Sequence, residues 1–159
     1  MLLCQLQKNV VNNLIKNKLI ISTCESATAG KIASSICDIP GASNVLKESY
    51  ITYSNESKIK ILGVDKNIID TYGVVSKETA NEMAYNLHKI TNADICVSIT
   101  GNLGPDTLED KPAGLVYIGI YFNNNTNVYE CNFDGFRIEI KDKVVLKTFE
   151  LLNDILENL

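Results

Sequence analysis

The sequence contains one histidine and no tryptophan. A metal site built from several imidazoles is therefore excluded, and any serine–histidine or cysteine–histidine mechanism would depend on His88. That residue falls inside a segment whose apolar residues recur at helical spacing. We therefore interpret His88 as a residue of a solvated helix face rather than as a catalytic base.

The sequence also lacks paired cysteines, a secretory apolar segment and any long apolar run. Its five cysteines form an odd set without a C-x-x-C pair, which predicts reduced, mostly buried thiols in a cytoplasmic protein. No apolar run approaches the roughly 18 residues of a membrane-spanning helix. The net charge of −4 argues against a general nucleic-acid or membrane binder, so we expect neither partner.

Hydrophobic periodicity predicts one α/β domain over residues 1–159. The chain is long enough to bury a core without disulfides or metals, and it shows neither linker nor repeat. Helices are expected over 2–16, 28–37, 55–62 and 67–71, from Ser76, and over 138–156. Strands are expected over 19–24, 47–53, 94–100, 115–122 and 128–133. This order predicts a three-layer α/β/α sandwich with a mixed, mostly parallel sheet of about five strands.

The segment 19–31 contains the most informative junction, because an apolar run ends at Glu25-Ser26 and small residues then lead into a helix. A strand that turns directly into a helix places the turn at the carboxyl edge of its sheet. There the free N–H groups of the helix start can receive an anion. Ser26 is therefore a possible nucleophile. Ser26 and Thr28 could equally act only as helix caps, and the residues alone leave both interpretations open.

Gly30-Lys31 invites comparison with a phosphate-binding P-loop, but the comparison fails. Glu25 stands where the first glycine is required, and Ile32 stands where a serine or threonine would bind magnesium. We therefore exclude a nucleotide triphosphatase of this class.

Three further polar clusters stand at the ends of predicted elements, where open α/β sheets usually bind ligands. They are Tyr53-Ser54-Asn55 with Lys58, Thr100–Pro105, and Gly135-Phe136-Arg137. Each also has a purely structural interpretation. Tyr53 could be an ordinary strand aromatic, Lys58 a solvated helix residue, Thr100-Gly101 a tight turn, and Arg137 the partner of an acidic neighbour.

Taken together, these clusters resemble the C-terminal domain of the competence/damage-inducible protein family, CinA. The resemblance is collinear over residues 5–157. Glu25–Gly30 resembles the family pattern E-S-C-T-G-G, and Pro40–Ser43 resembles P-G-x-S. In the middle of the chain, Tyr53–Lys58 resembles Y-S-N-x-x-K and Gly73–Ser76 resembles G-A-V-S. After the third expected strand, Thr100–Pro105 resembles T-G-I-A-G-P and Lys111–Tyr117 resembles K-P-V-G-T-V-Y. Before the last expected helix, Gly135–Arg137 resembles G-D-R.

The resemblance implies hydrolysis of the carboxamide of nicotinamide mononucleotide to nicotinate mononucleotide and ammonia. Carried over, Ser26 would be the nucleophile, Lys58 with Tyr53 would activate it, and Thr100 would assist as an oxyanion donor. The expected substrate-binding set is Glu25, Thr28, Gly30, Asn55, Gly101, Gly104 and Arg137. The resemblance implies no metal and no organic cofactor. It also implies the stand-alone form of the domain, assembled as a homodimer or higher homo-oligomer.

Several positions depart from the family pattern. Ala27 and Ala29 replace a cysteine and a glycine beside Ser26, and Asp106–Asp110 replaces a glycine-rich segment with acidic residues. Phe136 and Lys141 depart from the last motif. These changes leave two alternatives to the amidohydrolase: a catalytically altered nucleotide-binding or regulatory module, and an amidase for another small amide.

Overall fold

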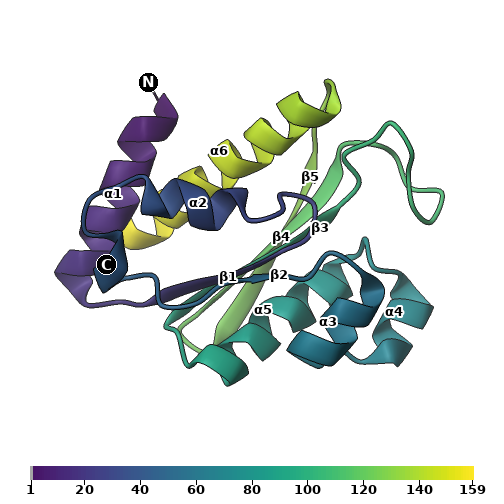
Figure 1. Ribbon diagram of the computed structural model, residues 1–159, viewed down its shortest axis with the longest axis horizontal. Helices are drawn as coiled ribbons and strands as arrows, with labels where there is room; N and C mark the ends of the chain where they lie inside the picture. The colour runs from purple at the N-terminus through teal and green to yellow at the C-terminus, as the bar shows by residue number, and fades with distance from the viewer. Residues whose placement is uncertain (1) are drawn as a thin grey trace.

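A five-stranded mixed sheet lies between two layers of helices in the computed structural model, which describes residues 2–159 (Figure 1). Helices α1, α2 and α6 cover one face, and α3, α4 and α5 cover the other (Figure 1). This arrangement confirms the predicted three-layer α/β/α sandwich. The helices are α1 (Leu2–Asn17), α2 (Lys31–Cys37), α3 (Asn55–Leu62), α4 (Lys66–Tyr72), α5 (Lys77–Thr91) and α6 (Arg137–Glu157), with a short 3₁₀ turn at Ala42–Asn44. The strands are β1 (Ile21–Glu25), β2 (Tyr50–Ile51), β3 (Ile95–Gly101), β4 (Leu115–Phe122) and β5 (Asn125–Asn132).

The strand order is β2-β1-β3-β4-β5. Strand β1 runs parallel to β2 and β3, and β4 runs antiparallel to both β3 and β5. Four of the five strands therefore point in one direction, which confirms the mixed, mostly parallel sheet. Because β1, β2 and β3 end at the same edge, the segments that follow them are brought together there.

Three elements, β2, α2 and β5, differ most from the expected ranges, each for a local reason. Strand β2 is limited to Tyr50–Ile51, because the carbonyls of the next two residues accept hydrogen bonds from a lysine side chain instead of a strand. Helix α2 begins only at Lys31, because Ala29 and Gly30 have φ of 50° and 91°. Strand β5 begins at Asn125, because the preceding two asparagines have positive φ and form a two-residue hairpin turn.

Two apolar clusters fill the space between the sheet and its helix layers. Alternate side chains of β3 point to opposite faces, so Val97 packs toward α1, α2 and α6 while Cys96 packs toward α5. The larger cluster includes Phe149 of α6, whose side chain is fully buried. Helix α6 therefore seals one face of the sheet.

We expect Phe149→Ala to lower the free energy of unfolding by about 3–5 kcal/mol, because it removes a large buried side chain and leaves a cavity. Urea denaturation followed by circular dichroism measures this change. Phe136→Ala is the matched control, because Phe136 is 83% exposed. We expect it to shift the unfolding free energy by less than about 0.5 kcal/mol. An equal loss in both variants would contradict the assignment of Phe149 to the core.

Candidate active site

A cavity of about 240 Å³ opens at the edge where the parallel strands end. Its walls come from the segments after β1, β2 and β3, from the segment before α5, and from the start of α6. Seven of the predicted site residues line it, namely Ser26, Tyr53, Asn55, Lys58, Thr100, Gly101 and Arg137. The structure thus brings together clusters that lie far apart in the sequence.

Ser26 is held at the end of β1 by two hydrogen bonds to β3. Its backbone N–H and its Oγ both donate to the Ile99 carbonyl, each at 3.1 Å. The side chain is 6% exposed and lines the cavity. Helix α2 begins five residues later with Gly30 as its N-cap and no side-chain cap. Ser26 is therefore not a cap of α2, and the nucleophile interpretation is the one that the geometry favours.

The anion at the start of α2 belongs to the protein itself. Glu25 is 1% exposed, and its carboxylate accepts hydrogen bonds from the backbone N–H groups of Ile32 and Ala33 at 2.9 and 3.0 Å. It also accepts from the hydroxyls of Thr23 and Thr28, at 2.9 and 2.6 Å. The expectation that these helix N–H groups are free for a substrate anion is wrong, because Glu25 occupies them.

Glu25, Thr28 and Gly30 were predicted to bind substrate, but none of them lines the cavity. Glu25 and Thr28 are fully occupied with each other and with α2. Gly30 has φ of 91°, and a Cβ there would approach Ile51 Cδ1 to 3.1 Å. We correct their role accordingly: these three residues build the corner that presents Ser26.

Lys58 is buried on α3 without a counter-ion. Ser54 caps this helix by accepting from the N–H of Ser57 at 3.0 Å, and Gly63 ends it with φ of 66°. The Lys58 side chain is 1% exposed rather than solvated. Its Nζ donates to the carbonyls of Thr52 and Tyr53 at 2.9 and 3.3 Å. Within residues 2–159 it forms no ion pair.

Burial lowers the pKa of Lys58 from 10.5 to about 8, against the opposing effect of the nearby Cys24 and Glu109. The neutral amine is thus accessible near physiological pH. A neutral amine has two N–H bonds, and two backbone carbonyls are in place to accept them. The nitrogen lone pair is then left for another proton donor in the cavity.

The Tyr53 hydroxyl lies at the mouth of the cavity, where it contacts Arg137 and not Lys58. Tyr53 is 59% exposed, and its hydroxyl accepts from Arg137 Nη2 at 3.1 Å. Arg137 Nη1 donates to the Gly104 carbonyl at 2.7 Å. Only the backbone of Tyr53 contacts Lys58. We therefore correct the expected roles: Tyr53 and Gly104 orient the guanidinium, and Arg137 forms no ion pair within residues 2–159.

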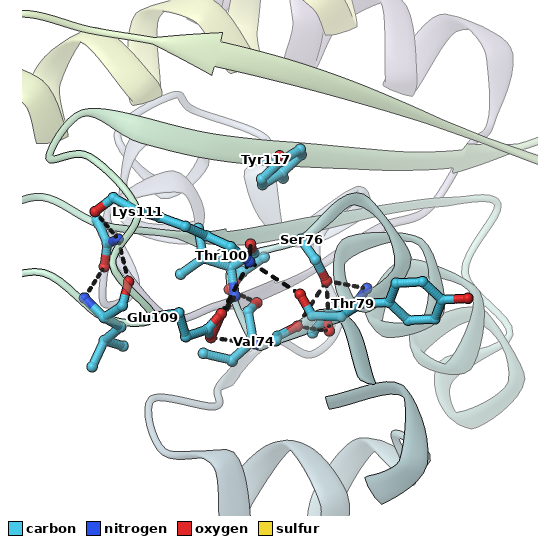
Figure 2. Close-up of polar contacts among 12 residues, drawn as sticks. Val74, Ser76, Thr79, Thr100, Glu109, Lys111 and Tyr117 are labelled. Atoms are coloured by element: carbon cyan, nitrogen blue, oxygen red, sulfur yellow. Dashed lines mark hydrogen bonds and ion pairs between the residues drawn. The ribbon is translucent and has the colours of Figure 1, made fainter. Parts of the chain in front are cut away.

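Thr100 is 1% exposed, and its Oγ1 donates to the Val74 carbonyl at 2.7 Å (Figure 2). Its proton is therefore directed away from the cavity in this structure, so the predicted oxyanion-donor role would require a rotation of the hydroxyl. Gly101 follows at the end of β3, where a Cβ would lie 2.7 Å from the Leu115 carbonyl. The close approach of β4 accounts for this glycine.

Asn102 and Leu103, from the predicted cluster Thr100–Pro105, also line the cavity. Sequence reasoning missed the remaining walls, which are Ala27, Val74, Val75, Asp106 and Leu108. Asn102 organises the loop after β3. Its Nδ2 donates to the carbonyls of Leu108 and Lys111, each at 3.2 Å, and its Oδ1 accepts from the Leu108 N–H at 3.0 Å.

His88 does not line the cavity. It is half-buried, its ring stacks on Tyr121 with centroids 4.1 Å apart, and its Nδ1 lies 2.8 Å from the Ala93 carbonyl. The helix-face interpretation therefore holds, with packing in place of full solvation.

Over the described residues, all five cysteines are free, and no cluster of three metal-ligating side chains occurs. None of the helices within residues 2–159 has the length and apolarity to cross a membrane.

Fold and site together define a mixed α/β domain with a buried serine and a buried lysine at the carboxyl edge of its parallel strands. Residues 3–156 match the family model of the CinA C-terminal domain, and the chain belongs to this family.

Similar proteins agree with this assignment. A protein of Clostridium beijerinckii named for competence-damage induction is 42% identical over 153 residues, which are 95% of this chain and 37% of that protein. The chain thus spans about a third of the length of such relatives. A CinA superfamily protein from Klebsiella pneumoniae superposes with a TM-score of 0.95 at 25% identity and 99% coverage of both chains. A competence/damage inducible protein from Agrobacterium tumefaciens gives 0.92 at 32% identity, over 99% of this chain and 96% of the other.

We expect Glu25→Gln to lower the free energy of unfolding by about 1–3 kcal/mol, because an amide NH₂ would face a backbone N–H donor in a buried site. Urea denaturation measures the loss. Glu56→Gln, at an exposed position of α3, is the control and should leave stability unchanged. Unchanged stability of Glu25→Gln would contradict the structural role of this carboxylate.

Lys58 should contribute a distinctive pH dependence to stability. Its pKa is lower in the folded state, so between about pH 8 and 10.5 the unfolded chain binds more protons and the free energy of unfolding rises with pH. Lys58→Met removes this contribution. We expect the stability of the variant relative to the parent to decrease as the pH rises through that window, measured by urea denaturation at each pH. A difference that is constant with pH would argue against a depressed lysine pKa.

Proposed function

We propose that the protein hydrolyses the carboxamide of nicotinamide mononucleotide to nicotinate mononucleotide and ammonia. The observation that carries this proposal is the presence of Ser26 and the buried, unpaired Lys58 in the walls of one cavity. A serine hydroxyl is a weak nucleophile until a base takes its proton. Lys58 is the base that the cavity offers, because the one histidine of the chain lies elsewhere.

In the first half-reaction, Ser26 Oγ attacks the amide carbon and its proton passes to the neutral Lys58 amine. The tetrahedral intermediate then collapses with cleavage of the C–N bond, and Lys58 returns the proton to the leaving nitrogen as ammonia departs. In the second half-reaction water attacks the resulting ester while Lys58 accepts one of its protons. The C–O bond to Ser26 then breaks, and Lys58 gives this proton to Ser26 Oγ as the acid leaves. Ser26 must first turn away from the Ile99 carbonyl, since catalytic contacts often form only with substrate bound.

The Ala27 N–H is the best-placed group to stabilise the oxyanion. Ala27 is 8% exposed, lines the cavity and directly follows Ser26. Within residues 2–159 its N–H has no hydrogen-bond acceptor, which is unusual for a buried backbone donor. The N–H after a nucleophile serves this purpose in other serine hydrolases. A well-aligned donor of this kind contributes about 3 kcal/mol to transition-state stabilisation.

The size of the cavity and the position of Arg137 orient the substrate. About 240 Å³ is below the roughly 300–1,000 Å³ of pockets that enclose a whole drug-sized ligand. We therefore place the pyridine carboxamide inside and the ribose and phosphate at the mouth. There the exposed guanidinium of Arg137, held by Tyr53 and Gly104, is suited to bind the phosphate.

One observation favours a second candidate, an amidase for a small amide without phosphate. Asp106 lines the same cavity as Arg137, and its carboxylate would repel a phosphate bound nearby. Comparing turnover of nicotinamide mononucleotide with that of nicotinamide and of its riboside distinguishes the two. Binding of the nucleotide without ammonia release would instead favour the regulatory module.

We expect Ser26→Ala and Lys58→Met each to reduce ammonia release from nicotinamide mononucleotide by at least about a hundredfold, because they remove the nucleophile and its base. A coupled ammonia assay measures the rate. The activity of the parent protein should rise with pH through about 8, as Lys58 loses its proton.

Ser43→Ala and Lys60→Met are the matched controls for these variants, because both residues are exposed and lie outside the cavity. They should retain the parent activity. Near-parent activity of either cavity variant would overturn the mechanism.

A further inference from the structure

The loop between β3 and β4 is tied to the segment before α5 by a charged side chain. Glu109 accepts from the Val74 N–H at 2.5 Å and from the Val75 N–H at 3.2 Å (Figure 2). These contacts join residues 34 and 35 positions apart. The two N–H groups belong to the segment that precedes Ser76, the N-cap of α5, so the carboxylate fixes the chain where it enters this helix.

Lys111 also connects the β3–β4 loop to the segment before α5. Its Nζ donates to the carbonyls of Tyr72 and Val75 and contacts Glu109 Oε2 at 3.0 Å (Figure 2). The side chains of Glu109 and Lys111 are only 26% and 29% exposed. A partly buried, hydrogen-bonded ion pair of this kind holds its surroundings more firmly than an isolated surface pair.

The absence of a side chain at Gly73 leaves the space that the Glu109 carboxylate fills. Gly73 has φ of 84°, and a Cβ added to it would lie 1.8 Å from Glu109 Oε2. The carboxylate thus occupies the space that any side chain at position 73 would need.

The opposite side of the same backbone segment forms the active-site wall. Val74 and Val75 line the cavity, and the Val74 carbonyl accepts from Thr100 Oγ1 at 2.7 Å. Glu109 itself does not line the cavity. One peptide segment is therefore held from outside by Glu109 through its N–H groups, and from inside by Thr100 through a carbonyl.

We propose that Glu109 is a positioning residue of the active site, which fixes the Val74–Val75 wall and, through Val74, the hydroxyl of Thr100. Its catalytic consequence rests on the proposed amidohydrolase function, whereas its structural consequence does not. Glu109 also acts on Lys58 over a longer range, since its negative charge raises the pKa of that lysine against the effect of burial. Cys24 is the other group that raises it.

The first test measures the kinetics of Glu109→Gln, which keeps the size of the side chain and removes its charge. We expect kcat to fall about tenfold, in line with the loss of charged hydrogen bonds, with KM changing by less than about threefold. The pH midpoint of kcat should also move to lower pH, because Lys58 loses a stabilising negative charge. A merely structural role would lower kcat without moving the midpoint.

Glu82→Gln is the matched control, because Glu82 also accepts from a backbone N–H, that of Asp65 at 3.1 Å, and does not line the cavity. It should leave kcat and its pH midpoint unchanged. If Glu109→Gln behaves like this control, the proposal is overturned.

The second test does not depend on any substrate. Amide hydrogen exchange of Val74 and Val75 should accelerate at least about tenfold in Glu109→Gln and stay unchanged in Glu82→Gln. An NMR titration of Lys58 should give a lower pKa in Glu109→Gln. Unchanged exchange and an unchanged lysine titration would overturn the positioning role even if the protein hydrolyses the nucleotide. If it does not hydrolyse the nucleotide, these two readouts still decide the proposal.

A double-mutant cycle separates the Gly73 contact from general damage to the loop. Gly73→Ala in the parent background should accelerate exchange at Val74 and Val75, because its Cβ displaces the carboxylate. In a Glu109→Ala background the same substitution should accelerate exchange less than it does in the parent, since the clash with the carboxylate is gone and only the backbone strain at φ of 84° remains. Full additivity would contradict a direct contact between the two positions.

Discussion

A buried carboxylate at the junction of β1 and α2 determines where Ser26 lies. Glu25 meets two backbone N–H groups at the start of α2 and two threonine hydroxyls, so its charge is shared among four donors and aligned with the helix dipole. Burying a charge is costly unless such partners are present. Because they are, the chain can leave β1 in a sharp turn, with Ser26 bonded to β3 at the edge of the cavity.

Lys58 is buried in different electrostatic surroundings from Glu25. Glu25 is buried with its hydrogen bonds satisfied, whereas Lys58 is buried against two carbonyls and without a carboxylate partner. The four donors around Glu25 stabilise a carboxylate, whereas burial without a carboxylate partner destabilises the charged form of Lys58. This edge of the sheet therefore contains a carboxylate that builds the β1–α2 corner and a lysine whose pKa is lowered by burial.

Much of the fold was predictable because its signals are local. The serine and glycine that bound α3 are typical helix caps, and β4 is a continuous apolar run that a short window of sequence contains. Ser26, Lys58 and Thr100 were recognisable because each lies near the end of an element and matches a motif. The roles of Glu25, Tyr53 and Glu109 were not recognisable, because their side-chain partners are set by tertiary packing. The hydrogen bond from the Val74 N–H to Glu109 joins residues 35 positions apart, so no periodic pattern in the sequence predicts it.

The hydrogen bond between Arg137 and Tyr53 joins residues 84 positions apart, and Arg137 is the first residue of the last helix. Ser26, Lys58 and Thr100 all precede β4, so their part of the cavity is encoded by the first two-thirds of the chain. Arg137 is supplied only by α6, one of the helices that cover one face of the sheet. During synthesis Ser26 and Lys58 therefore leave the ribosome before Arg137. The helix that supplies Arg137 to the cavity wall also contributes side chains to the hydrophobic core.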